Sequence, residues 1–204
     1  MKYLEALQAR DLGGGLGFRG QSFSGFTGTM AAGLAAGSTV LGVRYPLLSY
    51  GLMLIQSIHL HYTCIGTFTN PVTAGRRLSL RRGAGGDPSG GTTLDVMRNL
   101  APAPGGGGAW TTGSLPAETL LTGQVATTGA LTMTGVTYET ETRARLLLSH
   151  VGTTGQDYDE IWAPDEPFYL HPGNLAGIVA PQTFDAAGTW QLNVKGYAIE
   201  VTPP

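Results

Sequence analysis

Two histidines are the clearest candidates for chemistry in this sequence of 204 residues. His59 and His61 are two positions apart, so on a β-strand both side chains project from one face, a spacing that a metal ion could bridge. A zinc or iron site needs a third ligand and supporting hydrogen bonds, and His150 and His171 are remote in the sequence. No carboxylate flanks the pair closely. We therefore interpret the pair as solvent-facing or interfacial, with a cupin-like metalloenzyme as the enzyme alternative.

Acidic residues are concentrated in one stretch, residues 157–166. They are Asp157, Asp159, Glu160, Asp165 and Glu166. A glycosidase needs two opposed carboxylates at a defined separation, which proximity on one loop does not provide. The stretch also lacks the regular acidic spacing of an EF-hand calcium loop, which leaves only a looser calcium site. We interpret it as a solvated acidic loop or a subunit contact, and we take Asp157, Asp159 and Glu160 as candidate assembly contacts.

Other motifs of catalysis are missing from the sequence. No serine stands in the Gly-x-Ser-x-Gly pattern of a nucleophile elbow, and the glycines at 13–17 are not followed by the Gly-Lys-Ser/Thr of a phosphate loop. Cys64 is the single cysteine, so neither an intrachain disulfide nor a zinc site built on thiolates can form. We predict a protein that is not an enzyme, with no catalytic residue, cofactor or metal site.

Charge is distributed unevenly along the chain. The first hundred residues carry nine Lys and Arg against four acidic residues, and the rest carry three against ten, so the net charges of +5 and −7 sum to −2. Segregated charge suits complementary faces of a repeating assembly, unless strands from both halves interleave in space. The densest basic group, Arg76, Arg77, Arg81 and Arg82, supplies further candidate assembly contacts. Four arginines in a net acidic chain do not indicate a nucleic-acid partner.

The elements that would position these residues are strands. The sequence holds 32 Gly and 12 Pro with 42% hydrophobic residues, a composition that folds but does not favour helices. Residues 50–66 alternate with a period of two: Leu52, Leu54, Ile58, Leu60, Tyr62 and Cys64 share one parity, which only Gln56 breaks. Shorter strands are predicted at 38–45, 77–80, 120–127, 130–138, 144–151, 168–170, 177–180 and 190–201. The fold class is therefore all-β, a β-sandwich or jelly roll.

Composition also suggests how the chain is organised. Residues 1–37 are rich in glycine and are predicted to form an extended N-terminal arm, or a flexible lead-in, before a sandwich domain at 38–204. Residues 101–114 form a predicted long loop. The longest apolar segment, 47–65, is interrupted by Ser57, His59 and His61, so no membrane span is expected.

Three blocks of sequence carry a resemblance to a known group of proteins. They are the run 28–38 leading to Arg44, the run Asp87-Pro88-Ser89-Gly90-Gly91-Thr92, and a C-terminal arrangement of Trp162, 167–174, 188–190 and 197–200. In these features the chain resembles the virion structural proteins of similar length that tailed bacteriophages encode. One position departs from the pattern, because Asn174 stands after Gly173 where an acidic residue is expected.

The resemblance implies a β-sandwich or jelly-roll subunit of the virus particle, assembled in the bacterial cytoplasm. The expected role is capsid decoration (cement), with a head spike or minor tail component as related roles. Expected partners are the major capsid protein or other virion subunits and further copies of the chain, with a trimer favoured. The alternative is a receptor- or carbohydrate-binding module that uses Trp110, Trp162 or Trp190 as a sugar platform.

Overall fold

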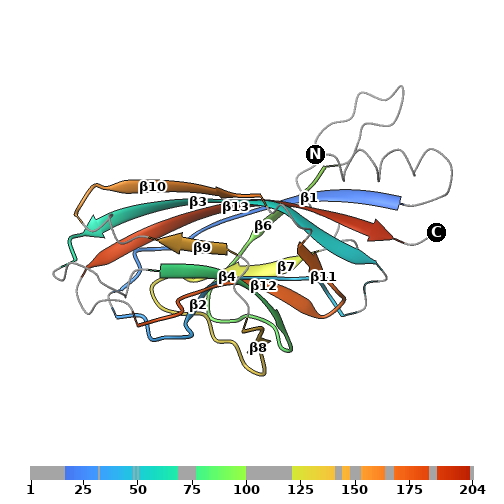
Figure 1. Ribbon diagram of the computed structural model, residues 1–204, viewed down its shortest axis with the longest axis horizontal. Helices are drawn as coiled ribbons and strands as arrows, with labels where there is room; N and C mark the ends of the chain where they lie inside the picture. Colours follow the sequence, from blue (N-terminus) through green and yellow to red (C-terminus); the bar gives the residue numbers. More distant parts are fainter. Residues whose placement is uncertain are drawn as a thin grey trace.

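The computed structural model describes residues 17–31, 33–47, 49, 51–68, 77–99, 121–140, 144–147, 153–163, 168–183 and 188–202. Within these ranges the chain consists of β-strands and their connections, and the strands form two antiparallel sheets packed face to face (Figure 1). The predicted all-β sandwich is therefore confirmed, whereas its jelly-roll connectivity stays a prediction. No helix that could span a membrane is found in the described part of the chain.

The first sheet has six strands in its described part, and its last strand in sequence lies at its centre. Its order is β10 (Asp157–Trp162), β3 (Leu52–Gly66), β13 (Thr189–Thr202), β1 (Gly17–Phe26) and β6 (Asp95–Asn99), with β11 (Phe168–Leu170) also paired to β3. Strands from both halves of the chain therefore interleave in one sheet. This interleaving brings residues together that are far apart in the sequence.

The second sheet has seven strands in its described part. Its order is β5 (Thr92–Thr93), β7 (Thr122–Val125), β2 (Thr39–Arg44), β12 (Asn174–Val179), β4 (Arg77–Ala84) and β8 (Thr137–Tyr138), with β9 (Ala144–Leu147) also paired to β4. Asn174, which stands where the resemblance implies an acidic residue, is the first residue of β12. Its side-chain oxygen accepts a hydrogen bond from the backbone N–H of His171 at 3.1 Å. An amide oxygen thus makes a bond that a carboxylate could also make.

A β-bulge explains why Gln56 interrupts the alternation of β3. The register against β13 shifts so that Ser57 pairs with Tyr197 and Ile55 with Ala198, which leaves Gln56 without a partner residue on β13. Because Gln56 is an extra residue in β3, odd-numbered residues point into the core before it and even-numbered residues point into the core after it. Leu54 is buried as the alternation predicts and Leu52 is half-buried, but Met53 and Ile55 are fully buried, whereas an unbroken alternation predicts them on the mostly polar face. That part of the predicted pattern was wrong.

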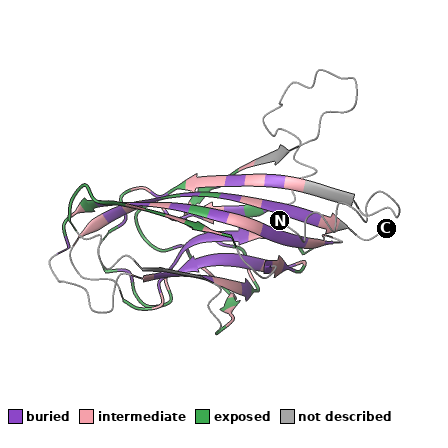
Figure 2. Ribbon diagram, turned by 45° about the horizontal axis from the view of Figure 1, so that its top comes forward, coloured by how far each residue is buried: buried purple, intermediate pink, exposed green. Residues whose placement is uncertain are grey.

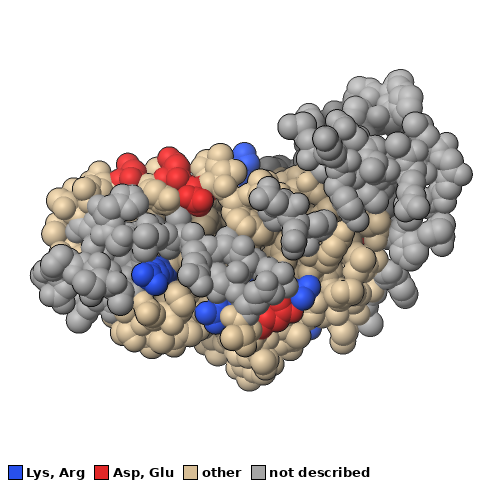
Figure 3. All heavy atoms as spheres, in the orientation of Figure 1, with Lys and Arg blue, Asp and Glu red and all other residues tan. Residues whose placement is uncertain are grey.

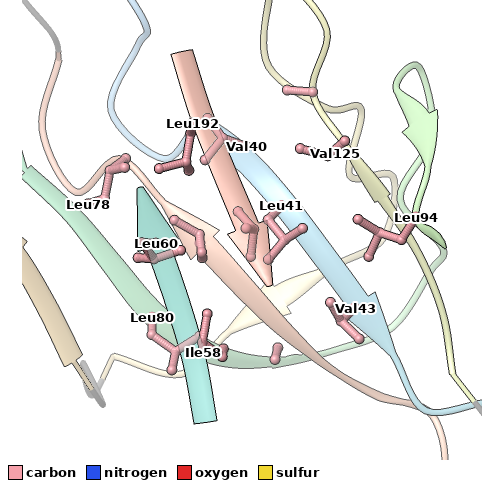
Figure 4. Packing of buried hydrophobic residues seen from close by; sticks show 14 of the residues in the cluster. Val40, Leu41, Val43, Ile58, Leu60, Leu78, Leu80, Leu94, Val125 and Leu192 are labelled. Carbon is pink, nitrogen blue, oxygen red and sulfur yellow. The ribbon is translucent and has the colours of Figure 1, made fainter. Parts of the chain in front are cut away.

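The core fills the space between the sheets. Figure 4 shows Ile58 and Leu60 of β3 and Leu192 of β13 near Leu78 and Leu80 of β4. Trp190 is fully buried and stacks on Tyr62, with ring centroids 5.6 Å apart. Burial of these side chains away from water is the main stabilising contribution to a fold of this kind.

The predicted arm at 1–37 is corrected from residue 17 onward, while residues 1–16 lie outside the described part. β1 pairs along its whole length with β13, and Met30 and Leu34 belong to the core. Glycines are costly inside a helix, but a strand tolerates them where large side chains fill the space that a Cβ would occupy. Tyr197 lies over Gly20 of β1 in this way.

The two sheets differ in their exposure to solvent. β2 and β12 are buried on both faces over almost their entire length, because the connections that carry Pro88 and Met133, together with Tyr138 of β8, cover the outer side of the second sheet. β13 instead alternates between buried and exposed residues over Trp190–Lys195, so the first sheet keeps one face in water (Figure 2). A surface site on a sheet face therefore belongs on the first sheet.

Candidate functional site

The outer face of the first sheet brings polar side chains into cross-strand rows. His61 of β3 stands opposite Asp159 of β10 on one side and Asn193 of β13 on the other. His59 stands opposite Lys195 of β13 in the neighbouring row. Side chains directly opposite each other on paired strands are close enough to interact. The strand pairing therefore surrounds the histidines with polar and charged groups.

Two histidines and two aspartates form what we name the His–Asp cluster: His59, His61, Asp157 and Asp159. Asp159 Oδ1 lies 2.8 Å from His61 Nδ1 and 3.3 Å from His59 Nε2, while Asp157 Oδ1 lies 3.9 Å from His61 Nε2. The hydrogen bond from His61 lowers the pKa of the Asp159 carboxyl below its ordinary value, because it stabilises the charged form. The cluster holds the edge strand β10 against β3 through exposed side chains.

This cluster corrects two expectations. The sequence suggested that no carboxylate lies near the histidines and that residues 157–166 form a loop, whereas β10 is a strand over Asp157–Trp162 and delivers two carboxylates to the pair. Nearly a hundred residues separate the partners, so only the strand pairing could reveal the contact. A signal was present in the alternation of β10: Tyr158 and Trp162 pack against the core while Asp157 and Asp159 are exposed.

A metal site does not emerge from this geometry. Within the described ranges, no group of three or more His, Cys, Asp or Glu side chains is arranged to hold a metal ion. The histidines lie on the solvent face of an open sheet, which gives the cupin-like alternative no enclosed site. Cys64 is buried between the sheets, as a small core residue.

A hollow on the same face, which we name the outer groove, shares His59 and His61 with the His–Asp cluster. Its volume is about 380 Å³. It is lined by Ser24, Gly25, Phe26, His59, His61, Asp95, Asn193, Val194 and Lys195. Four strands (β1, β3, β6 and β13) contribute these residues, so the groove crosses most of the sheet.

The basic candidates lie on the other sheet. Arg77, Arg81 and Arg82 are on β4, and Arg76 lies outside the described residues. Arg82 Nε donates to Glu139 Oε1 at 2.6 Å and its Nη1 donates to the carbonyl of Tyr169 at 3.3 Å. Arg82 therefore already serves an ion pair between the two halves of the chain, and the charge segregation seen in the sequence is partly cancelled within the fold.

The third acidic candidate, Glu160, points away from the His–Asp cluster. Glu160 Oε2 accepts a hydrogen bond from the Tyr158 hydroxyl at 2.7 Å. This bond is the main reason that the pKa of Tyr158 is raised, because the carboxylate favours the protonated phenol. Of the three acidic candidates, Asp157 and Asp159 thus come together on the outer face and Glu160 does not.

The tryptophans do not provide an open platform in the described part of the chain. Trp190 is fully buried, Trp162 is partly buried with its ring edge-on to Phe168 at 5.5 Å, and Trp110 lies outside the described residues. The exposed aromatic ring on the outer face is Phe26, which is 47% exposed. Sequence reasoning missed it, together with Asp95, Asn193 and Lys195, because none of them belongs to a recognisable motif.

No family model matches the chain, and a search of well-characterised proteins gave no match.

Proposed function

We propose that the chain is a structural subunit of a tailed-phage virion, a capsid decoration protein that binds the assembled head through repeated contacts and itself forms a small oligomer, with a trimer favoured. The proposal begins from the resemblance in the three sequence blocks. A sandwich with only 13% charged residues also supports it, because weak repulsion between copies favours assembly. Many weak contacts repeated over a symmetric shell would give firm attachment through effective concentration.

One observation favours assembly above the others: the free edge of the first sheet. β10 ends the strand order there, and no described strand pairs with its outer side. The strand exposes Asp157 and Asp159 together with Ile161, whose side chain is 66% exposed, and acidic side chains gather over β10 in Figure 3. An unpaired strand edge with an exposed isoleucine is a surface that a neighbouring subunit would cover.

The arginines of β4 would supply the opposite charge. In a ring of identical subunits the contact joins two different surfaces, so acidic β10 of one copy could meet basic groups of the next. Arg77 and Arg81 are the candidates for this role, because Arg82 is engaged by Glu139. The virion subunits and further copies of the chain are thus the partners that we propose.

The experiment measures the mass of the purified protein by light scattering, alone and with empty capsid shells of the phage that encodes it. We expect a stable small oligomer that binds shells at a fixed copy number. Ile161→Ser should weaken oligomer or shell binding by about tenfold or more, because a contact would bury this side chain. Its exposure in the single chain predicts that the variant folds normally.

Leu47→Ser is the matched control, because Leu47 is 67% exposed and lies beside Gly173 rather than on β10. It should assemble as the unaltered protein does. A monomer that ignores shells would contradict the decoration role. If Ile161→Ser and Leu47→Ser assemble equally well, β10 is not part of the subunit contact.

A further inference from the structure

The outer groove has the dimensions of a small-molecule site. One row of side chains crosses β3, β13, β1 and β6 as His59, Lys195, Ser24 and Asp95, and the next row includes Asn193 and Phe26. Strands lie about 4.8 Å apart and residues two apart are about 7 Å apart, so the two rows cover an area of roughly 14 Å by 7 Å. The volume of about 380 Å³ is within the range of ligand pockets.

The polar groups of the groove are available to a ligand. Their backbones are paired within the sheet, but the side chains of Ser24, Asp95, Asn193 and Lys195 make no hydrogen bond or ion pair with any described residue. Together they offer a carboxylate acceptor, an ammonium donor, an amide that does both and a hydroxyl that does both. Asp95 and Lys195 carry opposite charges, so the set suits a neutral ligand with many hydroxyl groups, each of which donates and accepts.

An aromatic ring completes the arrangement. Phe26 is the last residue of β1, lies beside Asn193 and is 47% exposed at the groove. The face of an aromatic ring packs against the apolar C–H face of a sugar ring and attracts its weakly positive hydrogens. The rigid pairing of β3, β13 and β1 holds the ring and the polar groups in fixed positions, which lowers the entropy cost of binding.

We propose that the outer groove binds a neutral saccharide, with Phe26 stacking on a sugar ring and Asp95, Asn193 and Lys195 bonding its hydroxyl groups. Other ligand classes fit less well. Asp95 offsets the positive charge of Lys195 within the groove, and Asp159 beside the groove would repel a phosphate or a nucleic acid. A mainly apolar ligand would leave the polar rows without hydrogen bonds. The inference does not depend on the role in the virion, since it concerns the isolated chain.

The test is saturation-transfer NMR on the purified full chain with a fixed panel of glucose, galactose, mannose, N-acetylglucosamine, maltose and lactose. Each sugar is used at about 10 mM, above the roughly millimolar Kd expected of a shallow groove. At least one sugar should receive saturation. Phe26→Ala and Asp95→Asn should each weaken its binding by about tenfold or more, since they remove the stacking surface and a charged acceptor.

Ile65→Ala is the matched control for the aromatic residue, because Ile65 is an exposed apolar side chain of β3 outside the groove. It should bind sugar as the unaltered chain does. Glucose 6-phosphate tests charge and should bind more weakly than glucose.

Three results would overturn the proposal. They are no saturation for any sugar of the panel, unchanged binding by both groove variants, or a preference for the phosphorylated sugar. If Phe26→Ala instead loses shell binding while no sugar binds, the groove belongs to a subunit contact. In that case the decoration role would stand and the saccharide site would fall.

Discussion

At the scale of single residues, the pair formed by Tyr45 and Glu200 is a buried polar contact inside an apolar core. The Tyr45 hydroxyl donates to Glu200 Oε1 at 2.6 Å and accepts from the backbone N–H of Gly51 at 3.2 Å. Glu200 has the same inward parity along β13 as Trp190, Leu192, Val194 and Ala198, because the extra residue of the bulge lies on β3 and leaves the alternation of β13 unbroken. Burial, and then the bond to Glu200, raise the pKa of Tyr45 to about 12.

This raised pKa predicts a loss of stability at high pH. Below about pH 10 the tyrosine is protonated whether the chain is folded or unfolded, so it has no effect on the pH dependence. Between about pH 10 and about pH 12 the unfolded chain loses the proton first, so the free energy of unfolding falls by up to about 2–3 kcal/mol. Urea unfolding over this range measures the effect.

Tyr45→Phe separates this contribution from other alkaline effects. The variant starts less stable, because Glu200 loses its donor, but its stability should fall less steeply between about pH 10 and about pH 12. Tyr197→Phe, on the partly exposed ring over Gly20, should keep the steep fall. Equal slopes for Tyr45→Phe and the unaltered chain would refute the assignment.

At the scale of elements, Gly177 of the second sheet makes room for a side chain of β8 that covers the outer face of this sheet. A Cβ at Gly177 of β12 would lie 2.5 Å from the Tyr138 hydroxyl and 2.6 Å from its Cε1. Tyr138 in turn shares a hydrogen bond of 2.9 Å with Thr39 of β2. Because Gly177 has no side chain, the Tyr138 ring can lie over β12 and its hydroxyl can bond to Thr39 of β2.

Gly177→Ala should accordingly displace Tyr138 and destabilise the fold by about 1–3 kcal/mol, measured by thermal or urea unfolding. The control is Gly129→Ala, because a Cβ there meets nothing within 4 Å and the residue has no positive φ. The control should change stability by no more than about 0.5 kcal/mol. Equal unfolding midpoints for Gly177→Ala and Gly129→Ala would show that the packing of Tyr138 does not require a glycine at position 177.

The elements differ in how well the sequence predicts them. β3, β2 and β13 have long apolar alternation or apolar runs, and they were found within a few residues of their ends. β1 was missed because its glycines suggested an arm, and β10 because its acidic residues suggested a loop. Both segments become strands by pairing with strands that are distant in the sequence: β1 pairs with β13, and β10 pairs with β3.

At the scale of the whole molecule, the candidate site depends on register more than on composition. Its residues come from strands that are as far apart in the sequence as β1 and β13. Each row of side chains exists only because the strand register places those residues opposite each other. The sequence shows that His59 and His61 share a face, since that follows from local geometry. It does not show that Asp159, Lys195 and Phe26 share that face, because the bulges and pairings that bring them there are tertiary.

The central position of β13 predicts that the sandwich is incomplete without it. β13 is the strand that joins β3 to β1 in the first sheet. A chain ending at Gly188 would leave facing edges of both strands unpaired and would remove Trp190 from the core. We expect it to lack a cooperative thermal transition, whereas a chain ending at Thr202 should melt as the full chain does. A cooperative transition in the shorter chain would contradict this prediction.

The same feature sets the timing of folding during synthesis. β3 ends at Gly66 and β13 begins at Thr189, so the ribosome must add the 122 residues 67–188 after β3 is made before its central partner starts. At about 5–20 residues per second, β3 waits roughly 6–24 s without that partner, and β1, which ends earlier in the chain, waits longer. The first sheet therefore closes late in translation, and its open edges are exposed to other nascent chains in the meantime.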